Sequence, residues 1–177
     1  MKKSILFLMA ASFVVLTACN NEKKADEGDK NEASVSSAES KQERNKKVIM
    51  TSFENFEKGD MDAVFKDAAP NFTDYADGSI PPITSIDSIK QFFNMMTTAF
   101  EGYKGENLKY FADGDYVLVH GDWGGVFKND FMGIKATGKP FKFKDVDIFK
   151  LSEEGKITEH SSVQNLAGVL MAAGMTK

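Results

Sequence analysis

The sequence predicts an α+β domain in which helices come first and a sheet of long antiparallel strands follows. Amphipathic helical patterns dominate residues 46–100, and alternating strand patterns joined by turn residues dominate residues 106–164. Helices and strands that are segregated in this way pack as helices against one face of a sheet. The 177-residue chain is 42% hydrophobic and 27% charged, which is typical of one globular domain with some additional sequence.

The composition excludes several classes of function. A net charge of −4 provides no basic surface for phosphates, so we expect no nucleic-acid partner. A single cysteine excludes a disulfide framework and a cysteine-rich metal site. The two histidines, His120 and His160, have no partners at metal-ligand spacing. We therefore expect no metal ion and no other cofactor.

The first 19 residues have the pattern of an export signal. A basic start is followed by an apolar run over residues 4–18, which is too short to span a bilayer as a mature helix. The run ends in the sequence LTAC at residues 16–19, which resembles the lipobox of bacterial lipoproteins. The resemblance implies that residues 1–18 are a lipoprotein signal peptide and that Cys19 is lipidated. It also implies a lipid-anchored protein of the bacterial cell envelope, at the outer membrane or cell surface if the cell is Gram-negative.

The segment after the cysteine is strongly polar. Residues 20–47 contain one branched aliphatic side chain, Val35, and no aromatic side chain. Such a segment buries too little apolar surface to offset the loss of chain entropy on folding. We expect residues 19–45 to form a disordered tether between the membrane and a domain over residues 46–177.

Within the domain, the early elements follow from apolar spacing and capping residues. Apolar side chains at positions 49, 53 and 56 share one helical face and predict a helix over 46–58. Asp60 is placed to cap a short second helix, and a brief strand over 72–75 ends at a turn. Ser85 is placed to cap a third helix that extends to about residue 100.

The later elements follow from alternation between turns. Turn signals at residues 113–115 and 136–140 separate runs of alternating apolar and polar side chains. The predicted strands cover residues 106–112, 116–128, 131–135, 141–151 and 156–164. A short helix over residues 166–173 is expected to close the domain.

Four short motifs resemble one family. They are FEKGD at residues 56–60, FMGIKATGK at 131–139, DIF at 147–149 and EGKITEH at 154–160. These segments resemble the SnoaL-like branch of the nuclear transport factor 2-like superfamily, which includes polyketide cyclases. The resemblance implies a cone-shaped fold, in which a curved antiparallel sheet wraps around the N-terminal helices and encloses an apolar pocket. Members include cyclases, steroid isomerases, hydrolases and binding domains, so the fold alone does not select a function.

Strand alternation identifies the side chains that face this pocket. In the strand over 141–149, the odd positions carry aromatic side chains and two acids, Asp145 and Asp147, whereas the even positions carry lysines. One hypothesis is acid–base catalysis, in which a protonated carboxyl beside Tyr75 stabilises an oxyanion while a second carboxylate moves a proton. The alternative is that one or both acids are solvated or bind backbone groups at a bulge.

The same reasoning gives a set of ligand-binding candidates and an expected outer face. Trp123 is expected in the core, the side occupied by His120 is left open, and His160 is expected on the exposed outer face. The complete set of ligand-binding candidates comprises Phe93, His120, Trp123, Phe143, Glu159, Ser161 and Asn165.

Two departures from the resemblance argue against cyclase chemistry. Cyclase-like members have Gly-Thr-His where this chain has Gly125, Val126 and Phe127, and Asn165 stands at the expected acid–base aspartate. An amide does not exchange a proton at neutral pH.

Three functions from different classes remain open. The first is a lipid-anchored module that binds a small apolar or amphipathic molecule. The second is an isomerase-type or hydrolase-type enzyme that uses the pocket carboxylates. The third is an interaction domain, expected to be a homodimer, whose pocket is filled by its own side chains.

Overall fold

The computed structural model describes the backbone of residues 30–172 and the side chains of residues 41–171. The expected signal peptide and Cys19 lie outside the described residues. In chain order the elements are α1 (Lys30–Glu57), α2 (Met61–Val64), β1 (Ala68–Asp74), α3 (Ile86–Ala99), β2 (Phe100–Asp113), β3 (Tyr116–Phe127), β4 (Pro140–Leu151), β5 (Ile157–Ser162) and α4 (Leu166–Ala172).

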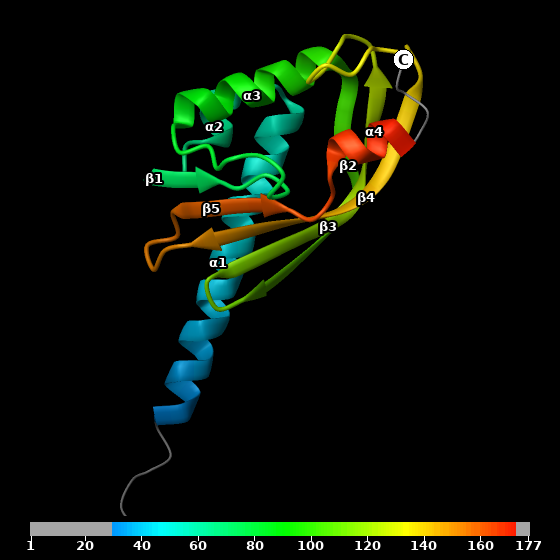
Figure 1. The fold of residues 1–177 in the computed structure, drawn as a ribbon. Helices are drawn as coiled ribbons and strands as arrows, with labels where there is room; N and C mark the ends of the chain where they lie inside the picture. Colours follow the sequence, from blue (N-terminus) through cyan, green and yellow to red (C-terminus); the bar gives the residue numbers. More distant parts are fainter. Residues whose placement is uncertain (1–29, 173–177) are drawn as a thin grey trace, which may run out of the picture.

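The five strands form one sheet in the order β1-β5-β4-β3-β2. The long strands β2, β3 and β4 bend strongly, and α3 and α4 lie on the side toward which they bend (Figure 1). This arrangement confirms the predicted α+β class and curved sheet. One strand pairing differs from the predicted antiparallel sheet. Strand β1 pairs with β5 in the parallel direction, whereas the other neighbouring strands are antiparallel.

The core consists of two groups of buried side chains. The first group joins the end of α3 to β2, β3 and α4, and its fully buried members include Phe100, Phe127 and Leu170. The second group joins α1 and the start of α3 to the middle of the sheet, with Ile49 and Ile89 completely buried. Both groups lie between the helices and the sheet.

The starts of the helices show which local sequence signals set their boundaries. Ser85 caps α3 by accepting a hydrogen bond from the backbone of Ser88, and Asp60 caps α2 through the backbone of Ala63, as predicted. The first helix differs from the prediction, because α1 begins at Lys30 and includes part of the segment that was expected to be a disordered tether.

Two contacts attach the N-terminal part of α1 to the sheet. The ammonium group of Lys41 contacts Asp115 at 2.7 Å and Glu153 at 2.5 Å, which lie in the two hairpin turns at one end of the sheet. The side chain of Asn45 is completely buried. These tertiary contacts, which a propensity argument does not include, hold α1 against the sheet from Lys41 onward. Among the described residues, no helix is long and apolar enough to cross a membrane.

The remaining strands agree with the prediction in position and differ in extent. Strand β1 begins at Ala68, and β2 begins at Phe100, directly after α3. The predicted strand over 131–135 is reduced to one bridge between Phe131 and Ile134, because the segment folds back on itself.

Candidate functional site

A cavity of about 190 Å³ lies between α1, α3 and the inner face of the sheet. Its walls are mainly aromatic, and they include Phe53, Phe93, Tyr103, Trp123, Phe143 and Phe149. The rings contact one another edge to face or tilted, with centroids 5.6 Å apart for Phe53 and Trp123 and 5.8 Å apart for Phe53 and Phe149. Because these contacts fix the walls, the cavity is a preformed apolar site rather than a gap between loose elements.

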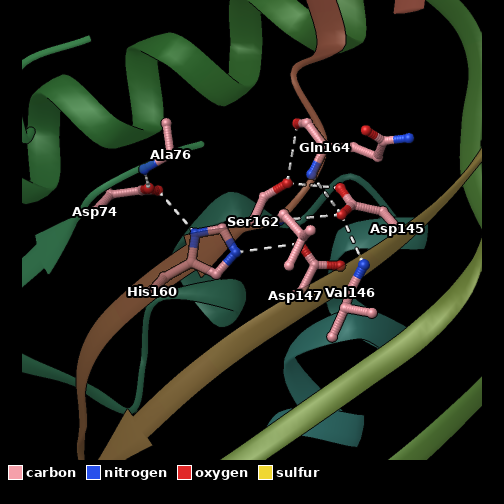
Figure 2. Close-up of polar contacts among 9 residues, drawn as sticks. Asp74, Ala76, Asp145, Val146, Asp147, His160, Ser162 and Gln164 are labelled. Atoms are coloured by element: carbon pink, nitrogen blue, oxygen red, sulfur yellow. Dashed lines mark hydrogen bonds and ion pairs between the residues drawn. The ribbon is translucent and has the colours of Figure 1, made fainter. Parts of the chain in front are cut away.

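The polar part of the lining comes from β1, β4 and β5. Strand alternation places Asp145 and Asp147 of β4 on the cavity lining, as the sequence predicts. From β5 and β1 they meet His160, Ser162 and Asp74 (Figure 2). The two carboxylates on β4 are only two residues apart, yet their hydrogen bonds differ completely.

Asp145 is saturated with hydrogen bonds from the protein. One carboxylate oxygen accepts from the backbone N–H groups of Val146 at 2.6 Å, Val163 at 3.2 Å and Gln164 at 3.0 Å. The other oxygen accepts from the hydroxyl of Ser162 at 2.6 Å. The residue is 7% exposed. Asp145 therefore fastens the chain after β5 to β4, as in the alternative in which an acid binds backbone groups.

His160 is held between two carboxylates. Its Nδ1 lies 3.1 Å from Asp74 and its Nε2 lies 3.2 Å from Asp147, so both ring nitrogens can donate only if the ring is an imidazolium (Figure 2). Burial alone lowers the pKa of His160, but the charge of Asp74 and the hydrogen bonds with both acids outweigh burial and raise the pKa to about 10. The ring also stacks on Phe149, with centroids 4.7 Å apart.

The two acids that flank His160 respond in opposite directions. Burial would raise the pKa of Asp74, but the His160 charge and hydrogen bonds from His160 and the backbone of Ala76 lower it. For Asp147, burial prevails and raises the pKa above its ordinary value. One oxygen of Asp147 contacts His160, and the other, Oδ2, is buried with no hydrogen-bond partner in the protein. Asp147 is thus the acid of the cavity lining whose second oxygen accepts no hydrogen bond from the protein.

Tyr103 is the tyrosine on the cavity lining. It lines the cavity from β2, and burial together with the charges of Asp147 and Asp145 raises the pKa of its hydroxyl. The hydroxyl therefore remains protonated throughout the physiological range and serves as a neutral hydrogen-bonding group.

Some predicted site residues do not reach the cavity. Tyr75 is 41% exposed and points outward, because its neighbour Asp74 occupies the inward position of β1. His120 alternates with the buried Val119 and lies on the opposite face of β3. Glu159 forms an ion pair with Lys150 at 2.8 Å rather than lining the cavity.

A bulge in β5 explains the other errors. Lys150 pairs with Glu159 whereas Leu151 pairs with Ile157, so Thr158 is an extra residue between two successive pairs. An extra residue reverses the alternation that follows it. His160 and Ser162 consequently face inward, and the prediction that His160 is exposed and Ser161 lines the cavity is wrong.

The other expected lining residues are in place. Phe93, Trp123, Phe143 and Asn165 line the cavity. The side-chain oxygen of Asn165 accepts a hydrogen bond from the backbone of Gly168 at 2.5 Å and so caps α4. The residues that sequence reasoning missed are Asp74, Tyr103, His160 and Ser162. In the described part of the chain, no group of three side chains is arranged to hold a metal ion.

Solved structures with the same fold come from several bacteria. A proposed polyketide cyclase from Xanthomonas campestris has 19% identity and a TM-score of 0.68, over 77% of this chain and 99% of that one. AclR, a proposed hydroxylase from Streptomyces galilaeus, has 20% identity and a TM-score of 0.64 over the same shares. A protein with a ketosteroid isomerase-like fold from Catenulispora acidiphila, solved with trimethylamine, has 17% identity and a TM-score of 0.59, over 72% and 92%. At these identities the likeness concerns the fold alone.

Sequence comparisons are more specific about the family. A comparison with curated proteins found no significant match. The family model for the SnoaL-like polyketide cyclase matches residues 47–172, which include every element from the second half of α1 to α4. This match, over more than half of the chain, shows that the chain belongs to the SnoaL-like polyketide cyclase family.

Proposed function

We propose that the domain binds a small, mainly apolar organic molecule in the aromatic cavity. The observation that carries the proposal is a cavity of about 190 Å³ with aromatic walls and one unpaired acidic oxygen. An apolar cavity of about 150 Å³ accommodates benzene. Pockets for drug-sized ligands occupy roughly 300–1,000 Å³. The volume therefore supports a ligand of one or two rings and argues against a molecule of several fused rings.

Native mass spectrometry of the full-length protein tests this proposal. We expect a bound small molecule that is lost on denaturation. The control is Ala167→Trp, which places a bulky side chain on the cavity lining and is expected to abolish the bound mass. A protein that never carries a bound mass and binds no small aromatic molecule in solution would contradict the proposal.

The proposal does not include a cyclase reaction. Asn165 occupies the position where the resemblance places an acid–base aspartate, and its oxygen is used to cap α4. Asp145, the acid nearest along β4 to this segment, has both oxygens engaged by the protein. These two observations argue that neither Asn165 nor Asp145 performs the proton transfer of the family's acid–base residue.

A second candidate function is proton transfer at a carbon acid, as in an isomerase. It is favoured by Asp147, whose raised pKa and unpaired oxygen beside an apolar cavity suit a general base. The test is deuterium incorporation next to the carbonyl of small cyclic ketones in heavy water. Proton transfer by Asp147 predicts faster incorporation with the wild type than with Asp147→Asn, and equal rates would contradict it.

Lipid anchoring through Cys19 is part of the same proposal. The support is the apolar run that ends in LTAC at residues 16–19 and the polar segment that follows it. Labelled palmitate is expected to be incorporated into the wild type and not into Cys19→Ala, which should leave the membrane fraction. Equal labelling of both proteins would contradict the anchor.

A homodimer is also proposed, as an alternative basis for function. The outer sheet face carries paired charges, such as Lys142 with Glu106 at 3.0 Å and Lys144 with Asp122 at 2.6 Å. The same mass measurement reports the oligomeric state. A dimer without a bound molecule would favour an interaction domain over a binding module.

A further inference from the structure

Two unpaired polar atoms belong to residues that line the same cavity. Among the described side chains, three buried atoms have no hydrogen-bond partner in the protein, namely Asn45 Nδ2, Trp123 Nε1 and Asp147 Oδ2. Trp123 and Asp147 both line the cavity, and Trp123 is only 5% exposed. Buried donors and acceptors are nearly always paired, because an unpaired one loses its hydration without compensation. A donor and an acceptor left open in one cavity indicate the polar groups of its ligand.

The two atoms belong to opposite parts of the cavity wall. Trp123 of β3 pairs with Phe143 of β4, and Asp147 follows four residues later on the same inward face. The backbone positions of Phe143 and Asp147 are therefore about 13 Å apart along β4. Tyr103 stacks on Trp123 with ring centroids 5.8 Å apart, and the charge of Asp147 acts on its hydroxyl. The aromatic wall therefore extends between the indole N–H and the carboxylate.

The charges of the lining decide which acceptor the indole N–H takes. The described lining carries four aspartates, Asp74, Asp77, Asp145 and Asp147, and neither lysine nor arginine. Its one cation, His160, is already shared between two of them. An anionic ligand would face these carboxylates without a compensating cation. The acceptor that reaches Trp123 is consequently an uncharged oxygen.

We infer that the ligand is an uncharged ring compound with a carbonyl oxygen at the Trp123 end and a hydroxyl group at the Asp147 end. The indole N–H of Trp123 donates to the carbonyl, and Oδ2 of Asp147 accepts from the hydroxyl. The apolar body of the ligand lies against the rings of Phe53, Phe143 and Phe149. This inference rests on the proposed function, since it names the chemical class of the molecule that the cavity binds.

Calorimetric titration of the full-length protein with matched probes tests the inference. The probes are 4-hydroxyacetophenone, which has both groups, acetophenone, which lacks the hydroxyl, and 4-ethylphenol, which lacks the carbonyl. Each hydrogen bond fills a group that is otherwise unpaired, so 4-hydroxyacetophenone is expected to bind about tenfold more tightly than either of the others. A fourth probe, 4-hydroxybenzoate, carries a carboxylate in place of the ketone and is expected to bind at least tenfold more weakly than 4-hydroxyacetophenone.

Two variants assign the groups to their partners. Trp123→Phe keeps an aromatic ring but removes the N–H, so it should abolish the preference for 4-hydroxyacetophenone over 4-ethylphenol. Asp147→Asn should reduce the preference for 4-hydroxyacetophenone over acetophenone severalfold, because an amide oxygen is a weaker acceptor than a carboxylate. Each variant leaves the other preference in place, and thermal unfolding checks that both fold.

The outcomes separate this inference from the proposed function. If the three uncharged probes bind equally to the wild type, or if 4-hydroxybenzoate binds best, the inference is overturned while binding in the cavity stands. If a folded Trp123→Phe retains the full preference, the inference is also overturned. If no probe binds and no bound mass is found, both the inference and the proposed function fail. The wild-type series decides the matter even if a variant does not fold.

Discussion

Two carboxylates that lie two residues apart on one face of β4 sit in contrasting surroundings. Around Asp145, three backbone N–H groups and one hydroxyl use both oxygens, and the acid joins β4 to the chain that leads into α4. Around Asp147, one oxygen contacts the His160 ring and the other has no partner in the protein. Both acids line the same cavity.

The difference shows that position on a cavity wall does not by itself assign a role to an acid. A carboxylate that accepts several N–H bonds is committed to the fold, because removing it weakens or breaks the pairing of those donors. A buried carboxylate with a free oxygen retains a bond for another molecule. We therefore assign Asp145 to the structure and Asp147 to the site, and the following predictions test that division.

The largest effect is expected from His160→Asn. The change leaves Asp74 and Asp147 without the cation between them, and breaking a buried ion pair from one side costs about 4 kcal/mol. Urea unfolding at pH 6, where the proton-linked stability of His160 is fully present, should show this loss of unfolding free energy, and the loss should shrink at pH 4 because protonation neutralises the acids. A loss that is equal at both pH values would contradict the role of charge.

The next effect is expected from Asp145→Ala. Removing the carboxylate leaves the backbone N–H of Gln164 without its acceptor and leaves Val163 N–H with only the carbonyl of Val146, and we expect a loss of about 3 kcal/mol in unfolding free energy. Asp145→Asn keeps one acceptor oxygen and should lose about half as much. If Asp145→Ala unfolds at the wild-type urea concentration, the assignment of Asp145 to the structure is wrong.

A pH effect of intermediate size follows from the imidazolium. The pKa of His160 is about 10 in the folded protein and about 6.5 in an unfolded chain. The folded state therefore holds a proton that the unfolded state releases, so stability falls as the pH rises from about 7 to 10. Unfolding free energy should decrease by on the order of 3 kcal/mol over this range. His160→Asn supplies the control, since its stability should vary much less over the same range.

A small effect on stability is expected from Asp147→Asn. The substitution removes a buried charge that is only partly compensated, so unfolding free energy should change by less than about 1 kcal/mol. Binding of small aromatic alcohols should weaken severalfold in the same variant, because an amide oxygen is a weaker acceptor than a carboxylate. A large loss of stability with unchanged binding would reverse the contrast with Asp145.

The smallest effect is expected from Tyr75→Phe. Tyr75 is 41% exposed and lies outside the cavity, so both stability and ligand affinity should stay within about 0.5 kcal/mol of the wild type. Tyr103→Phe is the matched comparison, because Tyr103 lines the cavity and its loss should alter affinity. Weaker binding in Tyr75→Phe alone would restore Tyr75 as a site residue.

The sequence predicts those parts of the site that depend on local pattern. Alternation in β4 placed Asp145 and Asp147 inward, and apolar spacing found Phe93, because burial follows a fixed period along regular strands and helices. The four hydrogen bonds that Asp145 accepts could not be predicted, since most of their donors lie in a segment whose path depends on tertiary contacts.

The bulge in β5 marks the limit of this reasoning. The extra residue at Thr158 turns His160 inward, whereas regular alternation without the bulge would place His160 on the outer face. The meeting of His160 with Asp74 also depends on the parallel pairing of β1 with β5, which links distant segments of the chain. Neither feature leaves a signal in local spacing, whereas a buried histidine flanked by acids becomes evident once the strands are placed.

Fluorescence of Trp123 tests the central claim most directly, because Trp123 is the chain's only tryptophan and it lines the cavity. The full-length protein is titrated with 4-ethylphenol while the indole is excited selectively. The account predicts a saturable change in emission for the wild type and for Asp145→Asn, and a midpoint shifted severalfold higher for Asp147→Asn. An emission that does not change would contradict the assignment of this cavity as the binding site, and a midpoint that is the same with and without the Asp147 carboxylate would contradict the assignment of Asp147 to that site.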